Sequence, residues 1–108
     1  MGHVDEAGRT HTVRIHISEE FPVKAPICDS SLPTEYEPSW CQGKTVRSIY
    51  EEFVEKVQQL QPFWMVMDEI DSNFWVLDPP KPRVNDLYRR ISLGNNVSVV
   101  IAVDPNEP

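Results

Sequence analysis

Apolar and polar residues alternate along residues 10–18 of the chain. Val13, Ile15 and Ile17 fall on one side of this pattern, and polar residues occupy the other. The two-residue period predicts a half-buried strand of an antiparallel sheet. Residues 19–40 follow with four prolines, and proline cannot donate a hydrogen bond to a neighbouring strand. We therefore expect a loop there, with short edge strands at most.

From Thr45 the period changes to that of a helix. Polar residues, many of them acidic, take the side opposite the apolar stripe, which is typical of an amphipathic helix lying on a sheet. The stripe contains Val46, Ile49, Tyr50, Phe53, Val57 and Leu60. We predict this helix from about Thr45 to Leu60.

Pro62 interrupts the pattern and suits the first position of a second helix. Trp64 falls at the edge of the apolar stripe of this helix, and Met65 points away from the stripe. The turn residues 71–73 end the helix, and residues 74–77 are predicted to be extended. The stripe itself, which we expect to be core of the first lobe, contains Phe63, Val66, Met67 and Ile70.

The proline-rich segment 78–83, Asp-Pro-Pro-Lys-Pro-Arg, is predicted to be a stiff linker. Beyond it, the pattern predicts two strands around a Gly94-Asn95-Asn96 turn. An isolated hairpin is marginally stable in water, so it must dock on another part of the protein. The sequence thus predicts an α+β fold with a first lobe at residues 1–77, the linker, and the start of a second lobe at 84–108.

Charge and composition narrow the classes of function. Seventeen acidic and ten basic residues give a net charge of −7, which disfavours direct binding to nucleic acid or to anionic membranes. The chain contains no basic run and no stretch of 18 apolar residues, so we expect neither a membrane span nor a signal peptide. Two cysteines fit a reducing, intracellular compartment and are expected to be separate thiols.

Three carboxylates lie close together at Asp68, Glu69 and Asp71. Asp68 and Asp71 are spaced to share one helix face. The stretch lacks the ladder of oxygen ligands of a calcium loop, and a second acidic cluster for hydrolysis is missing. We expect the three carboxylates to be solvated.

The histidines and cysteines give only a weak sequence signal for a metal site or for a catalytic nucleophile. The spacing of Cys28 and Cys41 is not that of a structural zinc site, so we expect no zinc. Cys41 precedes a predicted helix and is the better candidate nucleophile, although it lacks an evident orienting base. The histidines that would have to join a metal site are His3, His11 and His16.

Large apolar residues near the linker exceed what one helical stripe can bury. Each of them has a simple alternative as a core residue of a small domain. As a group they are candidates for a partner-binding surface or for a seam between lobes. The candidate partner-binding residues are Trp64, Met65, Trp75, Leu77, Ile91 and Leu93.

Two stretches resemble known families. Phe21 to Pro26, Phe-Pro-Val-Lys-Ala-Pro, resembles the aromatic-Pro turn of RWD domains, which are relatives of the ubiquitin-conjugating fold. Residues 63–83, followed by residues 89–108 (Arg-Arg-Ile-Ser-Leu-Gly-Asn-Asn-Val through Asp-Pro-Asn-Glu-Pro), are similar to the central double-RWD region of the Fanconi anaemia complementation group L family of RING-type ubiquitin ligases. The close similarity covers about Phe63 to Pro108, and a looser one extends back to the first strand.

The resemblance implies a fold and a role. It implies an RWD-type antiparallel sheet packed by a long helix, in a nuclear and cytoplasmic ligase of DNA cross-link repair. The central region of that family docks the paired Fanconi substrate proteins and contacts the core repair complex. A separate zinc-binding RING recruits the ubiquitin-conjugating enzyme. We expect this chain to begin inside the first lobe, to stop early in the second and to lack zinc and ligase activity of its own.

An enzymatic alternative follows from the same fold. Ubiquitin-conjugating enzymes carry ubiquitin as a thioester on a cysteine, here Cys41 or Cys28. The His-Pro-Asn motif of those enzymes precedes neither cysteine, which disfavours this alternative.

Overall fold

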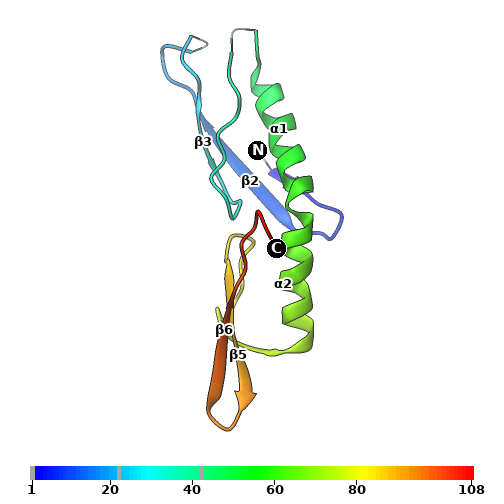
Figure 1. Cartoon of the computed structure of the whole chain (residues 1–108). Coiled ribbons are helices and arrows are strands. Elements are labelled where there is room, and N and C mark those ends of the chain that lie inside the picture. The colour runs from blue at the N-terminus through cyan, green and yellow to red at the C-terminus, as the bar shows by residue number, and fades with distance from the viewer. Residues whose placement is uncertain (1, 22, 42) are drawn as a thin grey trace. The chain divides into compact units, whose positions relative to one another are not determined.

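The computed structural model describes residues 2–21, 23–41 and 43–108. Pro22 of the predicted RWD turn lies outside the described residues. The chain forms two compact units, Met1–Gln59 and Leu60–Pro108, and each contains a three-stranded antiparallel sheet and one helix (Figure 1). The predicted α+β class is confirmed.

The sheet of the first unit has the order β1-β2-β3. Its strands are β1 (Gly2–Val4), β2 (Thr10–His16) and β3 (Ile27–Ser30). The predicted alternation of β2 is confirmed up to His16: the inward positions His11 and Val13 are buried, Ile15 is half-buried, and the outward positions are exposed. Ile17 departs from the prediction because the strand ends before it, and its side chain is exposed.

Helix α1 (Val46–Gln59) contacts β2. Its start is fixed by a reciprocal cap, in which Thr45 Oγ1 accepts from the Ser48 amide and Ser48 Oγ accepts from the Thr45 amide. The side chains of Ile49, Phe53 and Val57 are fully buried. The predicted amphipathic helix and its buried stripe are therefore confirmed.

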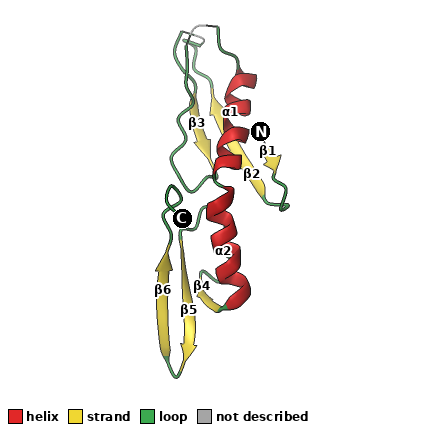
Figure 2. Cartoon of the chain, turned by 45° about the vertical axis from the view of Figure 1, so that its right-hand side comes forward, coloured by secondary structure: helices red, strands yellow, loops and turns green. Residues whose placement is uncertain are grey.

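The second unit begins with α2 (Gln61–Asn73), with proline in its first turn as predicted. The strands β4 (Trp75–Asp78), β5 (Tyr88–Gly94) and β6 (Val97–Ala102) follow. They form a sheet of order β4-β5-β6 (Figure 2). The predicted hairpin is confirmed, and β4 is the neighbouring strand that it needs.

The backbone conformation of the turn between β5 and β6 explains why its residues are glycine and asparagine. Gly94, Asn95 and Asn96 all have positive φ, at 85°, 51° and 62°. Glycine adopts this region freely, and asparagine tolerates it better than most residues do. The local sequence therefore fixes the position of this hairpin.

The division between the units differs from the one expected at residues 78–83. It falls between Gln59 and Leu60, so α2 belongs with the hairpin and not with the first sheet. Two side-chain contacts hold α2 to the residues beyond the linker. Trp64 Nε1 donates to the Val84 carbonyl at 2.9 Å, and Arg89 binds Asp71. The prolines interrupt the hydrogen bonding of the backbone, but the unit continues across them.

Candidate functional site

The sheet of the second unit has two unlike faces. Cα partners in register place Val76, Ile91 and Val99 in one row and Trp75, Ser92 and Ser98 in the next. Because successive side chains of a strand point to opposite faces, these two rows lie on opposite faces of the sheet. The face with Trp75 also carries Tyr88, Arg90 and Val100, and we call it the Trp75 face.

Helix α2 packs against part of the other face of this sheet, at Arg89 and Ile91, while Val99 on that face stays exposed. The guanidinium of Arg89 donates to both carboxylate oxygens of Asp71 in α2, at 2.7 and 3.3 Å. The Arg89 side chain is only 5% exposed, and Ile91 beside it is buried. Buried charges need such a partner, because desolvating an unpaired charge is costly.

The Trp75 face is open and mixes large apolar side chains with polar ones, among them Arg90 and Ser92. Trp75 is 75% exposed, and Val100 and Tyr88 are also exposed. The Tyr88 hydroxyl donates to Asp78 at 3.2 Å, and the nearby carboxylate raises the pKa of Tyr88 above its ordinary value. A tryptophan this exposed on a strand is the kind of anchor that protein interfaces use.

The structure places the six predicted partner-binding residues in different settings. Trp64 is 3% exposed and its indole is hydrogen-bonded to Val84, so its expected place on a docking surface is corrected to the interior. Ile91 is corrected in the same way, because its strand position faces α2. Sequence spacing alone misled the prediction for both residues, since it did not show which face the helix covers.

The other four predicted residues are exposed but do not all lie together. Met65 lies on the outer side of α2, away from the sheet. Leu77 and Leu93 sit where the strand register shifts, between Val76 and Asp78 and between Ser92 and Gly94. Trp75 is the one of the four that the register assigns to the open face.

The expectation of three solvated carboxylates is corrected for Asp71. Asp68 and Glu69 are exposed at the helix surface, but Asp71 holds the buried Arg89. The partner comes from a strand 18 residues later, so no local pattern could have revealed the pair. The contact assigns Asp71 a role in folding.

The two cysteines do not form a catalytic arrangement among the described residues. Cys28 lies half-buried in β3, and Cys41 is exposed. Burial, with a smaller effect of the Asp29 charge, raises the pKa of the Cys28 thiol. A raised pKa lowers the fraction of the nucleophilic thiolate at neutral pH.

A histidine and a carboxylate meet in the interior of the first unit. His11 Nε2 lies 2.9 Å from Asp5 Oδ2, and both side chains are fully buried. Asp5 Oδ1 also accepts from the amides of Ala7 and Arg9, and the Arg9 guanidinium lies 3.2 Å from Oδ2. The cluster therefore holds the β1–β2 turn and is closed to a substrate. Sequence analysis missed it, because residues 5 to 11 read only as a polar stretch.

The structure tests the metal and membrane hypotheses only for the residues that it describes. Within those residues, no three His, Cys, Asp or Glu side chains are grouped so that they could hold a metal ion. Neither helix in the described ranges has the length and apolarity needed to cross a membrane.

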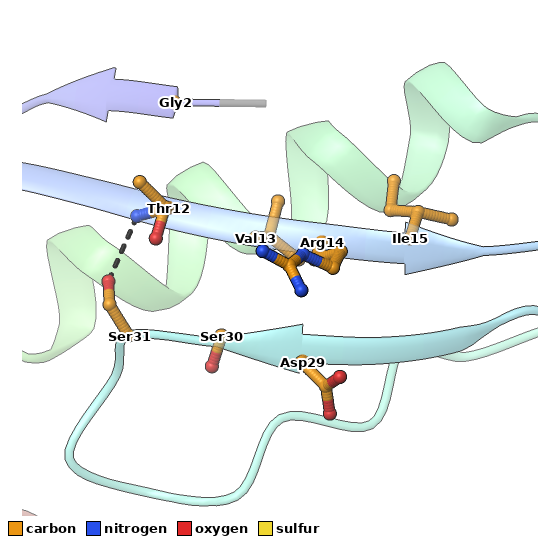
Figure 3. A pocket seen from close by; sticks show the side chains of 8 residues that line it. All are labelled: Gly2, Thr12, Val13, Arg14, Ile15, Asp29, Ser30 and Ser31. Atoms are coloured by element: carbon orange, nitrogen blue, oxygen red, sulfur yellow. Dashed lines mark hydrogen bonds between the residues drawn. The ribbon is translucent and has the colours of Figure 1, made fainter.

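A hollow on the first sheet is shown in Figure 3. Its charged lining residues are Arg14 of β2 and Asp29 of β3, which are Cα partners in register. Ser31 Oγ in its wall accepts from the Thr12 amide at 2.9 Å. The opposite charges offset each other and this hydroxyl is used within the sheet, so we assign no chemistry to the hollow.

Comparison with known proteins gives the family. Residues 1–60 match the model of FANCL UBC-like domain 2, and residues 62–108 match that of FANCL UBC-like domain 3. The chain is 39% identical over 104 residues to the E3 ubiquitin-protein ligase FANCL of Mus musculus. The match covers 96% of this chain and 28% of the mouse protein. The two models meet where the structure divides, and together with the mouse relative they show that the chain belongs to the FANCL family and carries sequence of its UBC-like domains 2 and 3.

Proposed function

We propose that this chain is a non-catalytic docking region of a ubiquitin ligase and that the Trp75 face holds a protein partner. The observation that carries the proposal is the 75% exposure of Trp75 on the open face of a sheet whose other face packs in part against α2. Large apolar side chains that lie exposed together on one face are a marker of protein interaction sites. Interface energy concentrates in a few aromatic anchors, and tryptophan is prominent among them.

Family membership supports a more specific role. The mouse relative is an E3 ubiquitin-protein ligase, and the resemblance implies that the central region docks the paired Fanconi substrate proteins and contacts core-complex subunits. We propose the same partners here, in DNA cross-link repair, with residence in the nucleus and cytoplasm. Recruitment of the conjugating enzyme and zinc binding would belong to a RING elsewhere in the parent protein.

The rival proposal is a thioester enzyme that uses Cys41 or Cys28. The raised pKa of Cys28 weighs against that residue, and the sequence around Cys41 lacks the oxyanion-stabilising motif of the conjugating enzymes. Incubation with ubiquitin and its activating enzyme tests the point directly. A reducible ubiquitin adduct, lost in Cys41→Ser or Cys28→Ser, would overturn the non-catalytic role.

Docking is tested with Trp75→Ala and a matched control, measuring a melting curve and a binding curve for each variant. The binding partner is the purified pair of Fanconi substrate proteins. Truncating an anchor costs about 2 kcal/mol or more, so the affinity of Trp75→Ala should fall about thirtyfold while its melting temperature stays close to that of the parent. Met65→Ala is the control, because Met65 is 66% exposed on α2, away from the Trp75 face.

The binding and melting curves distinguish a docking role of Trp75 from a structural role and from docking on another surface. Unchanged binding of Trp75→Ala would refute docking on the Trp75 face. Unfolding of Trp75→Ala would return the residue to a structural role. A loss of affinity confined to Met65→Ala would move the docking surface to the outer side of α2.

A further inference from the structure

Two neighbouring arginines of β5 point to opposite faces of the sheet, so that one is buried and the other is exposed. Arg89 faces α2 and is held by Asp71. Arg90, the next residue, is exposed on the Trp75 face. None of the ion pairs among the described residues of this unit includes Arg90, whereas Arg83 and Arg89 are both paired with carboxylates. Arg90 is thus an exposed cation beside an exposed tryptophan in a chain of net charge −7.

A hydrogen bond sets the direction in which Arg90 points. Its Nε donates to Ser98 Oγ of β6 at 3.0 Å. Asp78 is the Cα partner of Arg90 on β4, at the other side of β5, and the Asp78 carboxylate instead accepts from Tyr88. The guanidinium therefore leans over β6 and away from the carboxylate nearest in register.

On the β6 side, the neighbours of the guanidinium are uncharged and partly apolar, whereas Asp78 lies on the β4 side. Strand β6 contains no charged residue, and Val100 is the Cα partner of Arg90 on it. Trp75 is the Cα partner of Ser92, two residues along β5 from Arg90 and on the same face. Such diagonal neighbours lie about 7–8 Å apart, so one short segment of a partner reaches both.

The chemistry of arginine narrows what that segment must carry. A guanidinium pairs best with a carboxylate, through two parallel hydrogen bonds, and it loses less hydration than an ammonium does. With Nε occupied by Ser98, the terminal nitrogens remain to make the pair. Apolar contacts to Trp75 and Val100 on either side would shield it from water and strengthen it.

From this arrangement we propose that the protein segment that docks on the Trp75 face presents an acidic side chain to Arg90, next to apolar side chains that cover Trp75 and Val100. The inference rests on the proposed docking function and adds the charge of the partner. Arg90 is then a specificity-determining residue, because a segment with a basic or amide side chain at that place would leave the guanidinium covered and unpaired.

The test compares Arg90→Gln with Arg14→Gln in binding to the same purified substrate pair. Arg14 is a matched control, because it is also an exposed arginine of a strand and has no ion pair among the described contacts, but it lies in the first unit. We expect about a tenfold loss of affinity for Arg90→Gln and less than a twofold change for Arg14→Gln. Arg90→Lys should retain part of the affinity, since lysine keeps the charge and loses the paired geometry.

A charge exchange identifies the group on the partner. Arg90→Glu should abolish binding, and replacing the contacted acidic residue of the partner with lysine should restore part of it. The acidic residue is found by substituting the partner's exposed carboxylates one at a time. Only the correct position should rescue Arg90→Glu.

Each remaining outcome decides the matter. If Trp75→Ala loses binding while Arg90→Gln binds as the parent does, docking stands and the acidic contact is refuted. If neither variant changes binding, the docking function itself fails. Equal losses for Arg90→Gln and Arg14→Gln would show only long-range charge and would overturn the proposal. Loss of the Arg90 effect after phosphatase treatment of the partner would identify a phosphate in place of a carboxylate.

Discussion

The ion pair between Asp71 and Arg89 makes the stability of the second unit depend on Asp71, a residue that the sequence pattern predicts to be solvated. Replacing Asp71 with alanine leaves the guanidinium of Arg89, only 5% exposed, without its carboxylate. Breaking a fully buried pair costs about 3–5 kcal/mol. Asp71 is itself 35% exposed, so solvent screens the pair and we expect about 1–3 kcal/mol.

Urea unfolding followed by far-ultraviolet circular dichroism measures this loss. The transition of Asp71→Ala should shift to lower urea with an unchanged slope, since a changed slope would indicate a change in the surface exposed on unfolding. Glu69→Ala is the matched control: Glu69 is an exposed carboxylate two residues earlier in the same helix. Its free energy of unfolding should change by less than about 0.5 kcal/mol.

A double-mutant cycle separates the pair from the helix. Arg89→Met removes the charge and keeps an apolar stem, so the double variant Asp71→Ala/Arg89→Met should be no less stable than Asp71→Ala alone. Additive losses in the double variant would refute the reasoning. So would an Asp71→Ala variant that is as stable as Glu69→Ala.

Three further predictions concern the first unit. Phe53→Ala should lower the free energy of unfolding by about 3–5 kcal/mol, because a fully buried ring leaves a cavity; a loss below about 1 kcal/mol in a denaturant titration would contradict its place in the core. Burial, with smaller effects of nearby acidic groups, raises the pKa of Tyr36 to about 12, and its hydroxyl donates to the Ile49 carbonyl. Folding favours the neutral phenol of Tyr36. The stability that this preference contributes is therefore complete below the unfolded pKa of about 10 and is lost as the pH rises towards 12. In a tyrosinate absorbance titration, Tyr36→Phe should remove the step at the highest pH. Cys28 should react with iodoacetamide more slowly than exposed Cys41 at neutral pH; equal rates by mass spectrometry would show that burial does not protect it.

Periodicity alone was enough to find both helices, β2 and the hairpin, but it did not reveal β1 (Gly2–Val4). The buried stripe of α1, the alternation of β2 and the Gly94–Asn96 turn follow from local spacing and backbone preference. Each depends on residues within a few positions of one another, so the information lies in a short window of sequence. The apolar excess near Trp75 was also visible in the sequence as a candidate docking surface.

Only the tertiary structure decided which of these apolar and charged residues remain exposed. Trp64 and Trp75 look alike in the sequence, yet one is bonded to Val84 and the other lies open on the sheet. Arg89 and Arg90 are adjacent, yet the side of β5 that α2 covers buries one and exposes the other. Burial depends on contacts between distant segments, which period and composition do not specify. The boundary of the units was missed for the same reason, because α2 is joined to β5 across a stretch of prolines that local sequence marks as a break.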